Sequence, residues 1–575
     1  MSGVVSEYLH PLVRWNPGPQ RRWIAGRAAV AVALPLIGFT VAGHPQQAFL
    51  AGMGVFAVLY GASAPVRRRF VITPLAGLGL LASMALGIAL AGHAALAIIA
   101  MALAATVAAM LTYTLQIGPP GGFFFALVCG IGNLAATGGT PATTLLGIAG
   151  IGVLSAILVG TSDFWLRAHG VEDAAVTHAE HVVGTYLDEG DPARVPAARR
   201  AAARALNDAW TAVTDGGSDD RFGGRLQRVH SRYASAVSRA VDGPDAEVTA
   251  ELALHEAARV RQVSLGRPRA AWSMRQALRW PSEDLLVAAR VAAATLVAGG
   301  VALALDNAHA YWAAAFAVLI VHTGGTRSVQ FHRAFQRTVG TAAGLVVFAL
   351  LLRIDPTHWW IIAIIIGFQF VVELLITRNY ALAVIFLTPL ALLISESVTG
   401  MDPDTIVFDR AVDTLIGVGA AVVVLVVSSR LGRPELLLRA HARRVVLALD
   451  DVLADLAERR TRTDEGMAAH LDHCRQLYVE LLESDRVAAR AHADAPVAVA
   501  PYRRMEQSLA AIGYQVLGAT WNPRVRGQSE LMARAREELS GLTVHPVTRH
   551  RSADEITADL RRVQTILDEA LRAAH

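Results

Sequence analysis

The chain has 575 residues, of which 54% are hydrophobic and 17% are charged, and its formal net charge is +4. This composition is typical of an integral membrane protein, and the small net charge gives no reason to expect binding to nucleic acid. No lysine occurs anywhere, which excludes a phosphate-binding loop that needs lysine and a Schiff-base enzyme within this chain.

A polar and basic segment, 1–27, precedes a long series of apolar stretches. Their lengths and hydropathy predict twelve membrane-spanning helices in two blocks of six, which occupy 28–166 and 286–429. The predicted spans are 28–43, 48–65, 72–91, 94–116, 123–139 and 144–166 in the first block and 286–304, 309–325, 338–352, 359–376, 380–397 and 411–429 in the second.

Arginine placement predicts the orientation of these spans, because cytoplasmic loops collect positive charge. The arginines at 67–69 fall in the loop after the second span, and Arg327, Arg333 and Arg337 fall in the matching loop of the second block. We therefore expect a multi-pass membrane protein whose N- and C-termini both lie in the cytoplasm.

The two blocks share a sequence pattern. Arg27 begins an apolar stretch and Phe56-Ala57-Val58-Leu59 lies in the next one, while Arg290 and Phe316-Ala317-Val318-Leu319 hold the same relative places in the second block. The pattern predicts an internal repeat, a common way to build a transporter with a path between its halves.

Two polar regions follow the blocks, at 167–285 and 430–575. Apolar residues recur there at helical spacing, so each region is predicted to form a cytoplasmic bundle of amphipathic helices. The predicted fold class is an all-α integral membrane protein with two repeated six-helix transmembrane blocks, each followed by a cytoplasmic helical bundle.

One carboxylate lies inside an apolar span. Glu373 stands in the segment 368–375, and an ionised carboxylate in lipid is costly, so its side chain is expected to face the interior, to pair or to be protonated. Gln369 lies on the same helix face, and Arg378 is a candidate ion-pair partner five residues further on. A proton-coupling site and a structural ion pair both remain open as roles for Glu373.

The start of the third span in the second block reads Arg337-Thr338-Val339-Gly340-Thr341-Ala342-Ala343-Gly344. Gly340, Thr341 and Gly344 form a small-residue face that lets two helices approach closely. Arg337 serves either as an anchor at the membrane surface or as a contact for an anionic substrate.

Other polar residues allow simpler interpretations. His44 and His309 hold matching outward loop positions, as ordinary loop residues or as a pH-sensitive release site. Asp413, three residues after Arg410, fits a structural pair on one helix. We find no nucleophile–base set and no metal motif, so neither an enzyme nor a bound cofactor or metal is expected.

The second block resembles the fusaric acid resistance and aromatic acid exporter family. The resemblance rests on Tyr311-Trp312-Ala313, the element from Arg337 to Gly344, the run Arg378-Asn379-Tyr380-Ala381-Leu382-Ala383-Val384 before Thr388-Pro389, and Asp409-Arg410 before Asp413-Thr414. It implies a bacterial inner-membrane efflux protein, driven by protons, for aromatic or related organic acids. The first block departs from the pattern, since Arg69-Phe70-Val71-Ile72-Thr73 stands where the second has Arg337-Thr338-Val339-Gly340-Thr341.

The leading hypothesis is therefore a secondary exporter of small organic anions. Arginines would attract the anion and Glu373 would exchange the coupling proton. Candidate residues of the pathway are Glu373, Gln369, Arg337, Arg378, Tyr311, Trp312, Phe368, Phe370, Asn379 and Tyr380. A passive anion channel and a membrane scaffold or envelope-stress component acting through the polar regions are the alternatives. The sequence is equally compatible with a monomer and with a homodimer formed through those regions.

Overall fold

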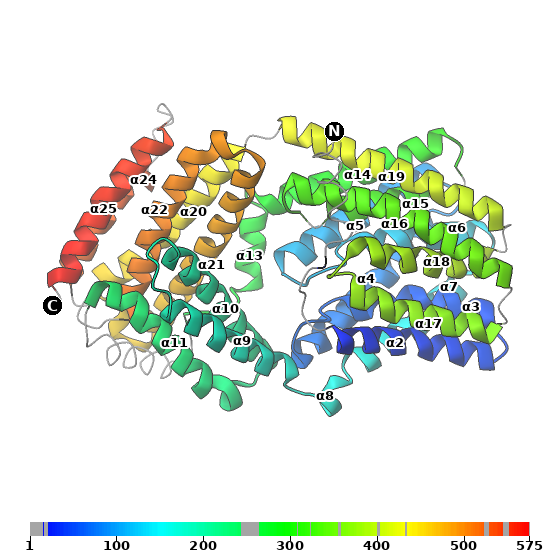
Figure 1. The fold of residues 1–575 in the computed structure, drawn as a ribbon, viewed down its shortest axis with the longest axis horizontal. Helices are drawn as coiled ribbons and strands as arrows, with labels where there is room; N and C mark the ends of the chain where they lie inside the picture. The colour runs from blue at the N-terminus through cyan, green and yellow to red at the C-terminus, as the bar shows by residue number, and fades with distance from the viewer. Residues whose placement is uncertain are drawn as a thin grey trace. The chain divides into compact units, whose positions relative to one another are not determined.

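The computed structural model describes residues 15, 21–242, 264–307, 309–322, 324–354, 358–399, 403–431, 434–521, 528–543 and 551–573. All regular elements in these ranges are helices (Figure 1). The chain forms two compact units. The first, called the membrane unit below, comprises Met1–Ala168 and Ala277–Gly432, and the second, called the polar unit, comprises His169–Gln276 and Arg433–His575.

The membrane unit contains the apolar helices of both blocks. Those of the first block are α2 (Arg22–Val41), α3 (Pro45–Val55) with the 3-10 turn η1 (Phe56–Leu59), α4 (Val66–Ala89), α5 (Ala94–Thr114), α6 (Phe123–Thr137), α7 (Ala142–Gly160) and the short α8 (Asp163–Leu166). Those of the second block are α14 (Glu283–Ala304), α15 (Ala310–Val321), α16 (Arg327–Ile354), α17 (His358–Leu375), α18 (Tyr380–Thr399) and α19 (Pro403–Leu431).

Each predicted span overlaps one of these helices. By length and composition, 7 helices of the described residues are long and apolar enough to cross a membrane, and five further apolar helices are shorter. The long ones are Arg22–Val41, Val66–Ala89, Ala94–Thr114, Ala142–Leu166, Glu283–Ala304, Arg327–Ile354 and Val407–Arg430.

The third helix of each block begins earlier than predicted. The arginines assigned to loops lie inside α4 and α16, and Arg69 and Arg337 are only 1% and 4% exposed. Arginine is a good helix former, and its guanidinium can be buried where polar or aromatic groups surround it. Hydropathy alone therefore misplaced both helix starts.

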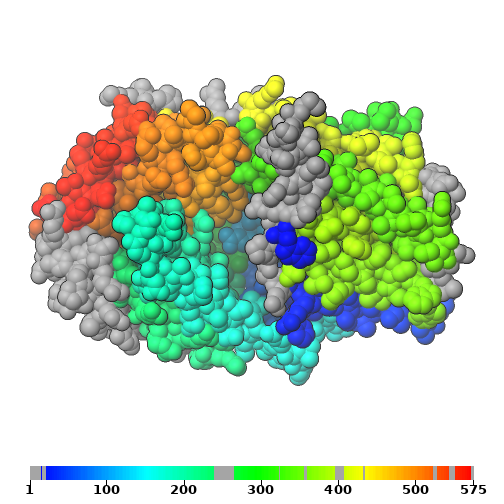
Figure 2. All heavy atoms as spheres, viewed as in Figure 1, coloured from blue at the N-terminus to red at the C-terminus, as the bar shows by residue number. Residues whose placement is uncertain are grey.

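The helices of the two blocks pack in corresponding ways. Within the blocks, α3 packs on α7 and α15 on α19, while α4 packs on α6 and α16 on α18. Between the blocks, α2 packs on α17 and α5 on α14, and Figure 1 shows α2 beside α17. In Figure 2 the atoms of α16, α17 and α18, in shades of lime green, form one surface of this unit.

Glycines allow two of these helix pairs to touch along their backbones. A Cβ atom on Gly152 of α7 would lie 1.9 Å from the carbonyl oxygen of Ala51 in α3. A Cβ atom on Gly417 of α19 would lie 2.6 Å from the carbonyl oxygen of Ala313 in α15. Any larger residue at either glycine would separate the helices.

The polar unit is built from amphipathic helices. They are α9 (Gly170–Leu187), α10 (Val195–Gly216), α11 (Asp219–Asp242), α13 (Ala270–Ala277, ending at the boundary), α20 (Pro434–Ala457), the turn η3 (Arg460–Arg462), α21 (Asp464–Asp494), α22 (Pro496–Thr520), α24 (Ser529–Thr543) and α25 (Ala553–Ala573). Local signals fix several ends. Gly217, with φ 61°, ends α10, and the Thr463 hydroxyl accepts the backbone N–H of Gly466 at the start of α21.

The two polar regions share one hydrophobic core. The prediction of a separate bundle for each region is therefore wrong. Val176 and Leu206 of the earlier region are buried in the same cluster as Leu449, Leu517 and Leu560 of the later region. Arg200 and Arg204 of α10 also pair with Asp485 of α21. Of the earlier region, α11 packs on α22 and α25, two helices encoded more than two hundred residues later.

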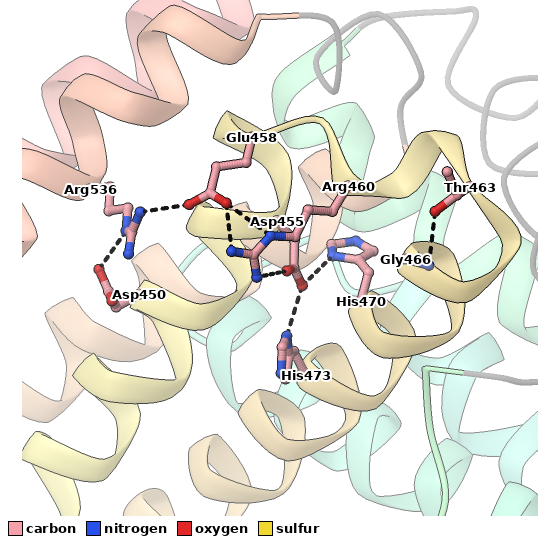
Figure 3. A network of polar contacts seen from close by, with 9 residues as sticks. All are labelled: Asp450, Asp455, Glu458, Arg460, Thr463, Gly466, His470, His473 and Arg536. Atoms are coloured by element: carbon pink, nitrogen blue, oxygen red, sulfur yellow. Dashed lines mark hydrogen bonds and ion pairs between the residues drawn. The ribbon is translucent and has the colours of Figure 1, made fainter.

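A buried polar cluster ties α20 to α21 and η3 (Figure 3). The Asp455 carboxylate, which is 1% exposed, lies 3.2 Å from Nδ1 of His470 and 2.8 Å from Nδ1 of His473, and it accepts a weaker contact from Arg460 at 3.5 Å. Burial acts to raise the pKa of Asp455, but the two imidazoles outweigh it and lower that pKa to about 2. Burial likewise opposes a charged His470, while Cys474 and Asp455 raise the pKa of His470 to about 9.

Candidate functional site

A cavity of about 1060 Å³ lies between the two blocks of the membrane unit. Residues of α2, α3, η1 and α6 line it from the first block, and residues of α15, α16, α17 and α18 line it from the second. Its volume is at the upper end of the range of about 300–1,000 Å³ that is usual for small-molecule sites. The four residues Phe56, Leu59, Phe316 and Leu319, from the two shared tetrapeptides, all line it.

The second block supplies most of the charge in the cavity. Arg333, Arg337 and Glu373 line it from α16 and α17, while Arg21 is the only Asp, Glu, Lys or Arg of the first block among the described lining residues. The side that the first block presents is largely apolar. It includes Phe49, Leu50, Met53, Phe56, Phe123, Phe124, Leu127, Ile131 and Leu134.

Arg337 is a buried cation that lines the cavity. Its guanidinium carbon lies 4.4 Å from the centre of the Phe316 ring, and it interacts with the nearby Tyr380. Its Nε and Nη1 atoms have no hydrogen-bond partner, and none of the ion pairs among the described residues includes it. A buried guanidinium without a carboxylate partner favours the arrival of an anion, which would satisfy both its charge and its free N–H groups.

Glu373 lines the cavity and is paired. Its side chain is 4% exposed, and its Oε2 atom lies 2.8 Å from Nη2 of Arg21, at the start of α2. The candidate partner Arg378 instead lies over the Trp15 ring, at 5.5 Å from its centre. Arg378 lies in the turn that follows α17, because the helix ends at Leu375, so helical spacing does not bring it to Glu373.

The remaining candidate residues divide into two groups. Gln369, Tyr311, Trp312, Asn379 and Tyr380 line the cavity. The other two, Phe368 and Phe370, are not among its lining residues, and Phe368 packs against Phe386 with ring centres 5.3 Å apart.

The sequence analysis missed two aromatic features of the cavity. Phe56 stacks on Phe124 with ring centres 3.9 Å apart, on the side of the first block. The buried Arg410 packs against Trp312, with its guanidinium carbon 3.5 Å from the centre of the Trp312 ring. The repeated Phe56 and Phe316 were the available signal for the first feature, while nothing in the spacing of Arg410 indicated the second.

Small residues hold α16 against α18 beside the cavity. A Cβ atom on Gly340 would lie 2.8 Å from the carbonyl oxygen of Ala381, and one on Gly344 would lie 3.0 Å from that of Ile385. Thr341, between them, is 2% exposed. This close contact fixes where Arg337, three residues before Gly340, projects from α16.

A polar cluster joins the loop before α15 to α19. Nδ1 of His309 lies 3.0 Å from Asp409, and Nδ2 of Asn307 donates to Asp413 at 2.8 Å. Asp413 therefore accepts a hydrogen bond from the loop between α14 and α15. The partner predicted from the sequence was Arg410, on the same helix. His309 lines the cavity and His44 is exposed, so the two matched histidines lie in different environments.

In the first block, Arg27 and Arg69 share one carboxylate of the same block. Oδ2 of Asp163 lies 2.9 Å from Arg69 and 3.0 Å from Arg27, and Arg69 also donates to the carbonyl oxygen of Gly160 at 2.6 Å. None of these residues lines the cavity. Over the described part of the chain, no group of His, Cys, Asp and Glu side chains has the arrangement of a metal site.

Part of the second block matches a known protein family. Residues 296–424 match the model of the family described as fusaric acid resistance protein-like. The uncharacterized membrane protein YvaC of Bacillus subtilis (strain 168) is 25% identical over 435 residues, which cover 67% of this chain and 68% of YvaC. No solved structure matches. The chain is thus a multi-pass membrane protein, and the resemblance seen in its motifs is confirmed: its second block carries a fusaric acid resistance protein-like region.

Proposed function

We propose that the protein is a secondary transporter that exports aromatic or related organic anions across the bacterial inner membrane, with proton coupling. The observation that carries the proposal is Arg337, a buried guanidinium that lines the cavity between the two blocks and has no acidic partner among the described residues. Trp312 and Phe316 offer aromatic faces beside it, and Gln369 and Tyr380 offer polar groups. An aromatic carboxylate matches this combination of charge and surface.

The two blocks act in this proposal as repeats that enclose the path. Their helices pair in corresponding order, and Gly152 and Gly417 form equivalent backbone contacts on α3 and α15. Each block also has a short second helix, Pro45–Leu59 and Ala310–Val321, and both line the cavity. Short helices in corresponding positions of two repeats are typical of transporter binding sites. The arginine distribution supports cytoplasmic ends and a cytoplasmic polar unit.

The Glu373–Arg21 pair is the proposed coupling element. A proton on Glu373 would remove the charge that holds Arg21, 2.8 Å away, and would loosen the contact between α17 and α2. Both residues line the cavity, so the pair senses its contents directly. Proton binding and the separation of the two blocks would then be linked.

The test measures accumulation of labelled hydroxybenzoate and fusaric acid in cells that lack their own exporters. We expect lower accumulation with the wild-type protein and no reduction when a protonophore is present. Glu373→Gln should reach the membrane and keep downhill flux but lose uphill export, and Glu435→Gln, outside the cavity, should behave as wild type. Uphill export by Glu373→Gln would reject the coupling role, and flux indifferent to the protonophore would favour a passive channel.

A further inference from the structure

The size of the cavity bears on what it holds. About 150 Å³ is enough space for a benzene ring in a protein interior. The cavity measures about 1060 Å³, so a single-ring acid would leave most of it empty of ligand. Binding sites enclose most of their ligand's surface, so a well-matched ligand is several times larger than one ring.

The two sides of the cavity differ in chemistry. The first block contributes an apolar wall that contains the stacked rings of Phe56 and Phe124 with Leu127, Ile131 and Leu134 on α6. The second block contributes the polar side, with Arg337, Gln369 and Tyr380. A ligand that fills both sides has one polar end and a large apolar body.

The charge of the polar end follows from the arginines. Arg21 is engaged by Glu373 at 2.8 Å, and Arg333 lies near the Tyr380 ring, 5.9 Å from its centre. Among the described residues, the Nε and Nη1 atoms of Arg337 have no hydrogen-bond partner, and no carboxylate pairs with this side chain. Arg337 therefore matches an anionic group on the ligand, which would compensate its buried charge.

We infer that the preferred ligand is a large amphipathic anion, with an anionic group on Arg337 and a body of several fused rings or a long alkyl chain against the wall of the first block. This inference rests on the proposed function and narrows its substrate class. The same chemistry is found in free polycyclic or long-chain acids and in anionic lipids of the bilayer.

The experiment measures binding to the purified full-length protein in nanodiscs of phosphatidylcholine. The probes are benzoate, 2-naphthoate, 1-pyrenecarboxylate and the uncharged 1-pyrenemethanol. Pyrenecarboxylate should bind at least about tenfold more tightly than benzoate, because more apolar surface is buried, and more tightly than pyrenemethanol. Nanodiscs with added phosphatidylglycerol identify the source: weaker pyrenecarboxylate binding there means that anionic lipid occupies the same site.

Variants assign the binding to the cavity. Phe56→Trp fills space on the apolar side of the cavity. It should weaken the binding of pyrenecarboxylate at least about tenfold and leave the binding of benzoate nearly unchanged. Leu158→Trp, at an exposed position of α7, is the matched control and should change neither. Arg337→Gln should weaken the binding of both acids.

The outcomes separate the two proposals. Equal affinity for benzoate and pyrenecarboxylate, both weakened by Arg337→Gln, would overturn the size inference and leave the proposed function standing. Carboxylate binding that ignores Arg337→Gln would overturn both. Binding of pyrenemethanol as tight as that of pyrenecarboxylate would show an apolar crevice and would overturn the requirement for an anion.

Discussion

Each of the two membrane blocks has a buried arginine in its third helix, and the two arginines have different partners. Arg69 in α4 shares the Asp163 carboxylate with Arg27 and lies outside the cavity. Arg337 in α16 lines the cavity and has no carboxylate partner in the part of the chain that the structure describes. One arginine holds its own block together, whereas the other leaves its charge available to a ligand.

We interpret this difference as a division of tasks between the two blocks. A buried ion pair is structurally committed, because removing either partner leaves an uncompensated charge. A buried cation without such a partner is unfavourable by itself and becomes favourable when an anion arrives. We interpret the first block as the structural half with an apolar wall and the second block as the half that recognises charge.

The largest stability effect should come from the arginine cluster of the first block. Asp163→Asn leaves Arg27 and Arg69 without their carboxylate, and we expect it to cost about 3–5 kcal/mol of unfolding free energy. Thermal unfolding of the detergent-solubilised protein measures this loss. The double variant Asp163→Asn with Arg69→Gln should recover part of the loss. A single variant as stable as wild type would contradict the division between the blocks.

The glycine contacts give a second comparison. Gly152→Ala should destabilise the protein by roughly 1–3 kcal/mol or more, because the new Cβ atom would overlap the Ala51 carbonyl oxygen. Gly417→Ala should cost less, since its nearest contact is 2.6 Å instead of 1.9 Å. Gly150→Ala on the same helix meets nothing within 4 Å and serves as the control. A larger loss of unfolding free energy for Gly417→Ala than for Gly152→Ala, measured by thermal unfolding, would contradict this order.

The polar unit offers a smaller effect that depends on pH. Asp455→Asn should lower the free energy of unfolding by about 1.5–3 kcal/mol near pH 5.5, the usual range for hydrogen bonds to charged groups. The pKa of His470 is raised from 6.5 to about 9, which stabilises the folded state. This stabilisation is fully present below pH 6.5 and is lost as the pH rises through about 9. The pKa of Asp455 is lowered from 3.8 to about 2, which also stabilises the folded state. This stabilisation is present above pH 3.8 and is lost as the pH falls toward 2.

The difference in melting temperature between wild type and Asp455→Asn should therefore be largest between about pH 4 and 6.5 and should shrink above pH 9. His473→Gln should behave in the same direction with a smaller difference, because His470 still reaches the carboxylate at 3.2 Å. A difference that grows steadily with alkaline pH would have the opposite sign and would reject a charged His470.

The existence and order of the membrane helices could be predicted from apolar runs, because burial in lipid demands them. Helix starts could not, since Arg69 and Arg337 are buried inside helices by ion pairing and by an aromatic ring. The sequence placed Glu373 in the interior but not beside Arg21, which lies 352 residues away and meets it only through the packing of α2 on α17. The shared core of the polar unit also depends on contacts that spacing does not encode.

The central claim is tested most directly by Arg337→Gln in proteoliposomes with an imposed pH gradient. The measurement is uphill uptake of a labelled aromatic acid by wild type, Arg337→Gln and Arg353→Gln, an exposed arginine at the other end of α16. The account predicts at least about a tenfold loss for Arg337→Gln, the weight of a lost charge-assisted contact, with folding retained and with Arg353→Gln unaffected. Equal transport by a well-folded Arg337→Gln would contradict the claim that this arginine receives the anion.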